Sequence, residues 1–113
     1  MEESILTSIK KHVGITKEYD HFDDDVMTYI NSTFFRLRQI GVGPSEGFYI
    51  KDDSLTWDNF ISDDPVLCNA VKTYMTAKVK LKFDPPASQS HIQVLKDTIA
   101  EFEWCMNIDA ESL

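Results

Sequence analysis

The side chains that could act as nucleophiles or bases in this chain are few and widely separated. Two cysteines, Cys68 and Cys105, and three histidines, at positions 12, 21 and 91, are all its thiols and imidazoles. A catalytic thiol needs a neighbouring base to remove its proton, and the spacing places no histidine beside either cysteine. The cysteines also lack the spacing of a metal site or a disulfide framework, so small buried or half-buried thiols are the favoured interpretation.

The carboxylates are more numerous, and their placement again suggests structural roles. Asp20, Asp23, Asp24 and Asp25 could bind a hard cation, but a calcium loop would also need a glycine at its bend and a distal glutamate. Capping and compensation of a helix dipole explain the cluster better. Glu101 and Glu103 point to different sides of a helix, so they do not form an acid–base pair. We therefore expect no catalytic residue, no metal and no cofactor.

Composition restricts the class of protein further. A chain of 113 residues with 42% hydrophobic residues can fill one core, which predicts a single domain over residues 1–113. The formal net charge of −8 makes sequence-independent binding of nucleic acid a poor hypothesis, because an acidic surface repels phosphate. The longest apolar runs are too short to cross a membrane. The acidic start, Met1-Glu2-Glu3, is unlike a secretory signal and predicts an intracellular protein.

Two segments with helical periodicity come first. The segment from Ser4 to Val13 has Ser4 as its expected N-cap and Gly14 as its stop. The segment from Asp23 to Ile40 is expected to begin at a capping Asp23 and to end before Gly41. Its apolar residues recur at spacings of four, four and three: Val26, Ile30, Phe34 and Leu37.

Residues 41–64 interrupt the helical pattern. Loop-forming residues gather at the start of this stretch: Gly41, Gly43, Pro44 and Gly47. Two short apolar runs, 48–50 and 55–57, could pair as a small β-hairpin. Alternatively, Thr56 caps a short helical turn that continues to Ile61. Phe48 and Trp57, which flank the loop, are expected to pack on the chain's own helices in preference to a neighbouring molecule.

Two longer helices follow. Asp64 and Pro65 provide the N-cap and first residue of the third, whose expected stripe is Leu67, Val71, Tyr74, Lys78 and Leu81. The fourth is expected to begin near Ser88 or Ser90 and to carry a heptad-like seam of Ile92, Leu95, Ile99, Phe102 and Met106. The short connection at 84–88 makes these helices an antiparallel hairpin. The predicted fold is all-α, a small four-helix bundle with an irregular insertion between its second and third helices.

Lys78 is notable because it falls in the middle of an apolar stripe. Its stem could pack while its ammonium reaches water, or the ammonium could form an ion pair across an interface. Glu103 is not its expected partner, since antiparallel register leaves the two about nine residues, or ~13 Å, apart along the axis.

Charge is unevenly divided between the last two helices. Between Val66 and Phe83 there are four lysines and no acid, whereas residues 84–113 hold six acids and only Lys96. Such asymmetry suits head-to-tail contacts between copies of the chain. The candidate interface residues are Lys78, Lys80, Lys82, Glu101 and Glu103. Stabilisation within a single hairpin explains the asymmetry equally well.

A set of short motifs covers nearly the whole chain in order. They are Ile5-Leu6-Thr7-Ser8-Ile9-Lys10-Lys11, Tyr19-Asp20-His21-Phe22-Asp23, Gly41-Val42-Gly43-Pro44 with Glu46-Gly47-Phe48, Thr56-Trp57, Val71-Lys72-Thr73-Tyr74, Lys78-Val79-Lys80, Phe83-Asp84-Pro85-Pro86 and Glu103-Trp104. With these motifs the chain resembles the small helical head–tail connector proteins, or portal adaptors, of tailed phages and prophages of Gram-positive bacteria.

The resemblance implies a non-enzymatic structural protein of the virion neck, made in the host cytoplasm. Such adaptors form a ring of about a dozen copies beneath the portal protein, extend the DNA channel and offer a platform to the next connector, stopper or tail protein. Double-stranded DNA would pass through without specific binding, past an acidic wall that repels phosphate. The resemblance also suggests that the C-terminal region docks on the portal, through Asn107, Ile108 and Leu113.

Two other classes of function remain as alternatives. An acidic regulatory adaptor or DNA mimic would bind a basic surface of a host protein, but its binding face should be uniformly acidic, and the lysines of the third helix argue against that. An enzyme is disfavoured because no nucleophile–base pair or metal set is visible.

Overall fold

The computed structural model describes residues 3–111, with side chains described for residues 3–108. Within that range the chain forms five helices and no strand, which confirms the all-α prediction. They are α1 (Ile5–His12), α2 (Asp23–Gln39), α3 (Trp57–Phe60), α4 (Pro65–Phe83) and α5 (Gln89–Glu111).

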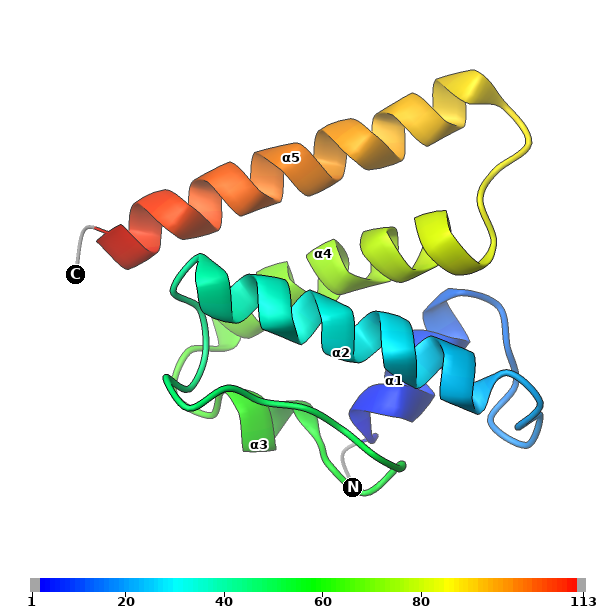
Figure 1. Cartoon of the computed structure of the whole chain (residues 1–113), viewed down its shortest axis with the longest axis horizontal. Helices are drawn as coiled ribbons and strands as arrows, with labels where there is room; N and C mark the ends of the chain where they lie inside the picture. The colour runs from blue at the N-terminus through cyan, green and yellow to red at the C-terminus, as the bar shows by residue number, and fades with distance from the viewer. Residues whose placement is uncertain (1–2, 112–113) are drawn as a thin grey trace.

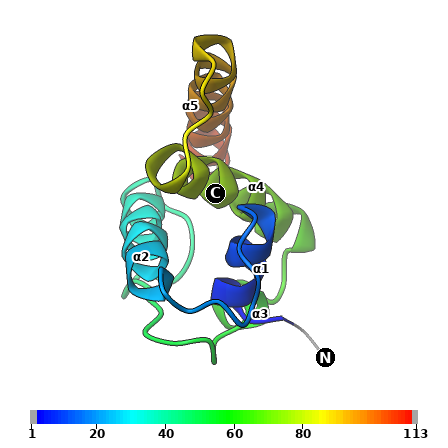
Figure 2. The same cartoon turned by 90° about the vertical axis from the view of Figure 1, so that its right-hand side faces the viewer.

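Helix α4 is the centre of the arrangement (Figure 1). It contacts α1 and α2 on one side and α5 on the other (Figure 2). The residues 84–88 join α4 to α5, and the two helices run antiparallel, as the sequence predicts. The core lies mainly between α1, α2 and α4, where Ile5, Ile9, Val26, Ile30, Val71 and Met75 are fully buried.

The buried face of α4 differs from the stripe expected from the sequence. Cys68, Val71, Met75 and Val79 point into the core, while Lys78 and Leu81 are only half-buried. The prediction was incomplete because α4 is covered on two sides. Val71 and Tyr74 of the expected stripe are fully buried, and Cys68, Met75 and Val79 form a second buried set beside them.

The first two helices begin in different ways. Ser4 caps α1 as predicted, since its Oγ accepts a hydrogen bond from the Thr7 amide at 3.1 Å. The prediction that Asp23 caps α2 is wrong, because Phe22 occupies the N-cap and Asp23 is the first helical residue. From there the Asp23 carboxylate reaches α1 and lies 2.7 Å from Lys10 Nζ.

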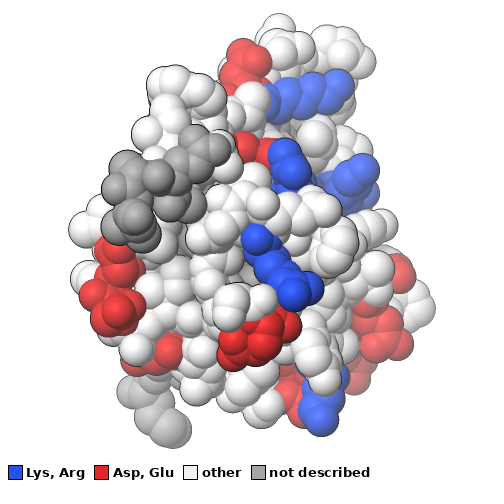
Figure 3. All heavy atoms as spheres, turned by 60° about the vertical axis from the view of Figure 1, so that its left-hand side comes forward, with Lys and Arg blue, Asp and Glu red and all other residues white. Residues whose placement is uncertain are grey.

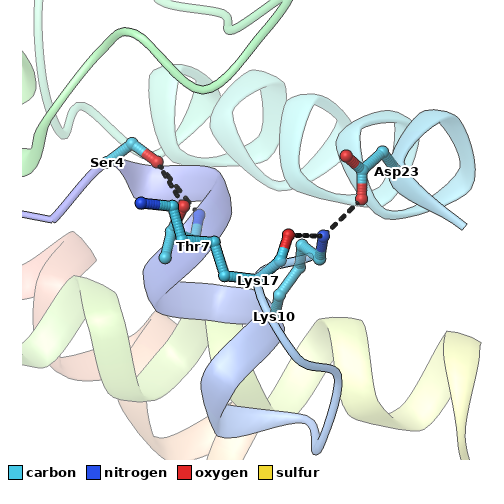
Figure 4. A network of polar contacts seen from close by, with 5 residues as sticks. All are labelled: Ser4, Thr7, Lys10, Lys17 and Asp23. Atoms are coloured by element: carbon cyan, nitrogen blue, oxygen red, sulfur yellow. Dashed lines mark hydrogen bonds and ion pairs between the residues drawn. The ribbon is translucent and has the colours of Figure 1, made fainter. Parts of the chain in front are cut away.

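This ion pair links α1 directly to the first residue of α2, across the loop that connects the two helices (Figure 4). Lys10 is 2% exposed, and its ammonium also donates to the carbonyl oxygen of Lys17 at 3.2 Å. A buried ammonium requires such partners, because it has lost its hydration. Lys10 therefore fixes α1, the loop at Lys17 and the start of α2 relative to one another.

The insertion between α2 and α4 does not contain the β-hairpin. Residues 48–50 run alongside α2, where the Asn31 side chain donates to the Ile50 carbonyl and accepts from the Ile50 amide, both at 2.8 Å. The Asn31 side-chain amide thus satisfies the two backbone groups of Ile50 that a neighbouring β-strand would otherwise satisfy. The alternative expectation is confirmed: Thr56 begins the short helix α3, and its backbone amide donates to the Asn59 side chain at 2.8 Å.

Gly43 allows the loop after α2 to lie close to α3. Its φ angle is +92°, and a Cβ atom at this position would lie 2.6 Å from the ring of Phe60. Gly14 has a similar φ of +89°, but a Cβ atom there would have no neighbour within 4 Å. A side chain at either position would therefore have an unfavourable backbone conformation, and only at Gly43 would it also lack space.

We expect Asp23→Asn to destabilise the protein by about 2 kcal/mol, because it leaves the buried Lys10 ammonium without its charged partner. Asp25→Asn is the matched control, as it removes an exposed carboxylate from the same helical turn and should cost about 0.5 kcal/mol. Urea-induced unfolding measures both. Equal losses of unfolding free energy would show that Asp23 acts only through the helix dipole.

We expect Gly43→Ala to destabilise the protein more than Gly14→Ala. Both changes place a side chain at positive φ, for about 1 kcal/mol, and only Gly43→Ala adds the clash with Phe60, for about 1–3 kcal/mol more. Thermal or urea unfolding of the two variants gives the difference. Similar losses at both positions would mean that Phe60 moves aside freely.

Candidate interaction surfaces

Helix α5 lies on the outer side of α4, with little cover from the rest of the chain (Figure 2). Among its described side chains, 89–108, only Met106 is buried. Val94, Trp104 and Ile108 are 59%, 67% and 41% exposed. A long helix that exposes several large apolar side chains is typical of a surface that binds another protein.

A series of polar contacts joins α5 to α2 and α4. Arg36 Nε lies 2.9 Å from Glu103 Oε1. The Tyr74 hydroxyl also interacts with the Glu103 carboxylate, and Lys78 Nζ lies 3.3 Å from Tyr74 Oη. The ammonium of Lys78 is 5.3 Å from the centre of the Tyr74 ring, within range of a cation–π interaction.

No ion pair joins Lys78 to Glu103 among the described side chains, as the register predicts, although the Glu103 charge favours the protonated form of Lys78 and so raises its pKa. Side chains lean toward the N-terminus of their own helix, so in this antiparallel pair Lys78 and Glu103 lean toward each other.

Burial shifts the pKa values of two groups in this cluster. It lowers the pKa of the Lys78 ammonium, and the charge of Glu103 offsets that effect only in part. Burial, followed by the charge of Glu103, raises the pKa of the Tyr74 phenol. The phenol thus stays neutral and can donate a hydrogen bond to the carboxylate.

The candidate interface residues divide into two groups. Lys78 and Glu103 have partners within the chain, as described above. Lys80 lies 3.6 Å from Asp84, one turn along the chain, in a largely exposed pair that contributes little to stability. Lys82 and Glu101 are exposed. The structure thus leaves Lys80, Lys82 and Glu101 more available to a partner than Lys78 and Glu103.

A groove of about 980 Å³ opens between the C-terminal half of α5, the first turns of α4 and the loops after α2 and α3. Val42, Leu67, Phe102 and Met106 contribute apolar surface to it. Asp63, Asp64 and Glu101 also line it, whereas no lysine or arginine does. We call this feature the acidic groove. The exposed Cys105 lies in it as well.

A smaller groove of about 310 Å³ has the opposite charge. It lies between the N-terminal half of α5 and the middle of α4, beside α1, and its lining includes His12, Lys72 and Lys80 but no acid. Lys72 also reaches over the ring of Trp57, 5.7 Å from its centre.

The residues of the predicted structural loop pack within the molecule. Gly41, Gly43 and Gly47 have positive φ, and Gly41, Gly43 and Pro44 line the acidic groove. The Phe48 ring meets those of Phe34 and Phe60 at 5.0 and 5.2 Å between centres. Trp57 is 2% exposed. Trp57 is thus enclosed by its own molecule, and Phe48 packs on it while remaining half-buried.

The residues assigned to portal docking lie at the end of α5. Asn107 is half-buried and Ile108 is 41% exposed, directly after the buried Met106. Leu113 lies outside the described residues. Asn107 and Ile108 thus follow Met106, the last buried residue among the described side chains of α5.

An exposed aromatic surface on α2 was not anticipated from the sequence. Phe35 and Tyr49 are 61% and 66% exposed. The hydrogen bonds from Asn31 hold Ile50 against α2, one turn from Phe35, and Arg38 Nε donates to the Ser45 carbonyl at 3.1 Å. We call Phe35, Arg38 and Tyr49 the α2 patch. The available signal was that Phe35 falls outside the apolar stripe containing Phe34.

Both signs of charge occur on the side of the molecule shown in Figure 3. Acidic groups lie at the top, left, lower centre and lower right of this view, and basic groups lie toward the upper right, at the centre and near the bottom. Within residues 3–108 no three His, Cys, Asp or Glu side chains are grouped so that they could hold a metal ion. None of the described helices is both long and apolar enough to cross a membrane.

We expect Glu103→Gln to lower the free energy of unfolding by about 0.5–1 kcal/mol, because it weakens the contacts of α5 with Arg36 and Tyr74 at a partly exposed site. Glu101→Gln is the matched control on the same helix and should change stability by less than about 0.5 kcal/mol. Urea unfolding of dilute protein measures both. A larger loss from Glu101→Gln would contradict this role of Glu103.

Comparison with known proteins identifies one family for the chain. No curated protein matches the chain, and no solved structure does. The model of one family, described as phage connector protein, matches residues 5–112, which includes all five helices and both grooves. The chain therefore belongs to the phage connector protein family.

Proposed function

We propose that this protein is a head–tail connector that assembles as a ring beneath the portal protein of a tailed phage, of the kind that infects Gram-positive bacteria. Membership of the phage connector family makes it a virion component that works with other phage morphogenesis proteins. The finer role is a non-enzymatic one: the ring extends the DNA channel and offers a platform to the next connector, stopper or tail protein.

The observation that carries this proposal is the exposure of α5. Its 23 residues pack mainly on α4, and Trp104 remains 67% exposed. Aromatic side chains of this kind often contribute strongly to binding between proteins. A ring would cover this helix with neighbouring copies or with the portal.

The charge of the chain fits a DNA channel. A formal net charge of −8 disfavours adhesion of phosphate to the ring wall, so DNA could slide past without specific contacts. A DNA mimic that binds a basic host protein is less well supported, because basic and acidic side chains share the face in Figure 3 and His12, Lys72 and Lys80 line one groove.

The test is native mass spectrometry of the purified protein, alone and mixed with the portal protein of the same phage. We expect an assembly of about a dozen copies on the portal. A chain shortened by residues 107–113 should fold normally, because Met106 stays in place, but should lose binding to the portal.

A pair of substitutions controls for the truncation. Ile108→Asp should weaken portal binding, whereas Gln89→Asp, at an exposed polar position at the other end of α5, should leave it unchanged. A monomer or dimer that ignores the portal under all conditions would contradict the connector role. Full portal binding by the shortened chain would contradict the assignment of docking to the C-terminal region.

A further inference from the structure

We infer that the acidic groove of one copy receives the α2 patch of a neighbouring copy, so that Phe35 enters the groove and Arg38 meets its carboxylates. This inference rests on the proposed ring and specifies the contact that builds it. The two surfaces belong to the same chain but share no residue.

Shape is the first argument. Both grooves on this molecule are concave, so one groove cannot fill the other. The α2 patch instead presents two large side chains, Phe35 and Tyr49, that are 61% and 66% exposed. A groove of about 980 Å³ with Leu67, Phe102 and Met106 in its lining can accommodate an aromatic ring.

Charge is the second argument. Asp63, Asp64 and Glu101 line the acidic groove without any lysine or arginine to balance them. Arg38 is exposed beside Phe35 on α2, and its hydrogen bond to the Ser45 carbonyl leaves other guanidinium donors available. An arginine next to an aromatic residue is a common combination at the centre of protein interfaces.

The two surfaces consist of different residues, and this determines the symmetry of their contact. A contact between two different patches is heterologous, since each copy uses its patch on one neighbour and its groove on the other. Repeated contacts of this kind close into a ring when the rotation per copy divides a full turn. A symmetric dimer would instead need one patch that recognises itself.

The native Cys105 allows a direct test, because it is exposed in the acidic groove. In the ring assembled on the portal, Phe35→Cys should form a disulfide with Cys105 of the next copy under mild oxidation. Denaturing gels without reductant should then show a ladder of covalently linked copies. Adding Cys105→Ser to this variant should abolish the ladder.

Thr28→Cys is the matched control, because position 28 lies two turns from Phe35 along α2 and is also exposed. It should give no ladder. A ring that assembles but yields no link between positions 35 and 105 overturns this inference while leaving the proposed function standing. A link formed within one chain overturns it too, since the two surfaces would then adjoin.

Exchanging the charges of Arg38 and Glu101 tests the contact between the α2 patch and the acidic groove without cysteine substitutions. Arg38→Glu should weaken ring assembly on the portal by about tenfold or more, because it places like charges together. Glu101→Arg should also weaken assembly, and the double variant should recover most of the loss. Unfolding curves of each variant verify that the monomer is intact. Absence of recovery in the double variant, with both single variants folded and impaired, contradicts direct pairing of Arg38 with Glu101.

Discussion

The fold depends on covering α4 from two sides. Val71, Met75 and Val79 of this helix are fully buried against the α1 and α2 side, while α5 lies along its outer side. Burial of this apolar surface is the main favourable contribution to folding, and every other helix except the short α3 takes its position from α4. The same requirement explains why apolar residues occur around so much of the α4 circumference, and why no single stripe describes it.

Polar side chains complete the arrangement where the apolar core ends. The Lys10–Asp23 pair fixes α1 against the start of α2, the Asn31 amide holds the extended segment at Ile50, and Arg36 connects α2 to Glu103 on α5. Each of these contacts joins residues distant in sequence or separated by a loop. The hydrophobic core of a small domain is limited. Such polar contacts therefore help to select one arrangement of the helices among several that would bury a similar apolar area.

The two sides of α4 differ in how fully they are buried, and this difference is relevant to function. The side of α4 that faces α1 and α2 is buried. On the other side, Trp104 and Val94 of α5 are exposed to solvent, and α5 forms one wall of each of two grooves of opposite charge. A phage connector works through contact with other proteins, so surfaces of this kind correspond to the chemistry it needs. In the proposed ring, long-range repulsion between acidic copies would be overcome locally, where an arginine meets carboxylates.

The amino-acid sequence by itself determined the helices, their ends at Gly14, Gly41 and the prolines after Phe83, and the antiparallel hairpin of α4 and α5, because these depend on local periodicity and capping. It also carried the family resemblance. Tertiary structure alone decided that Asn31 replaces a strand partner for Ile50, that Asp23 pairs with Lys10 in place of capping α2, and that Glu103 reaches Tyr74. It likewise brought Asp63 and Glu101 to one groove and left Phe35 exposed. These features depend on how helices distant in the chain approach one another, and local patterns do not encode that approach.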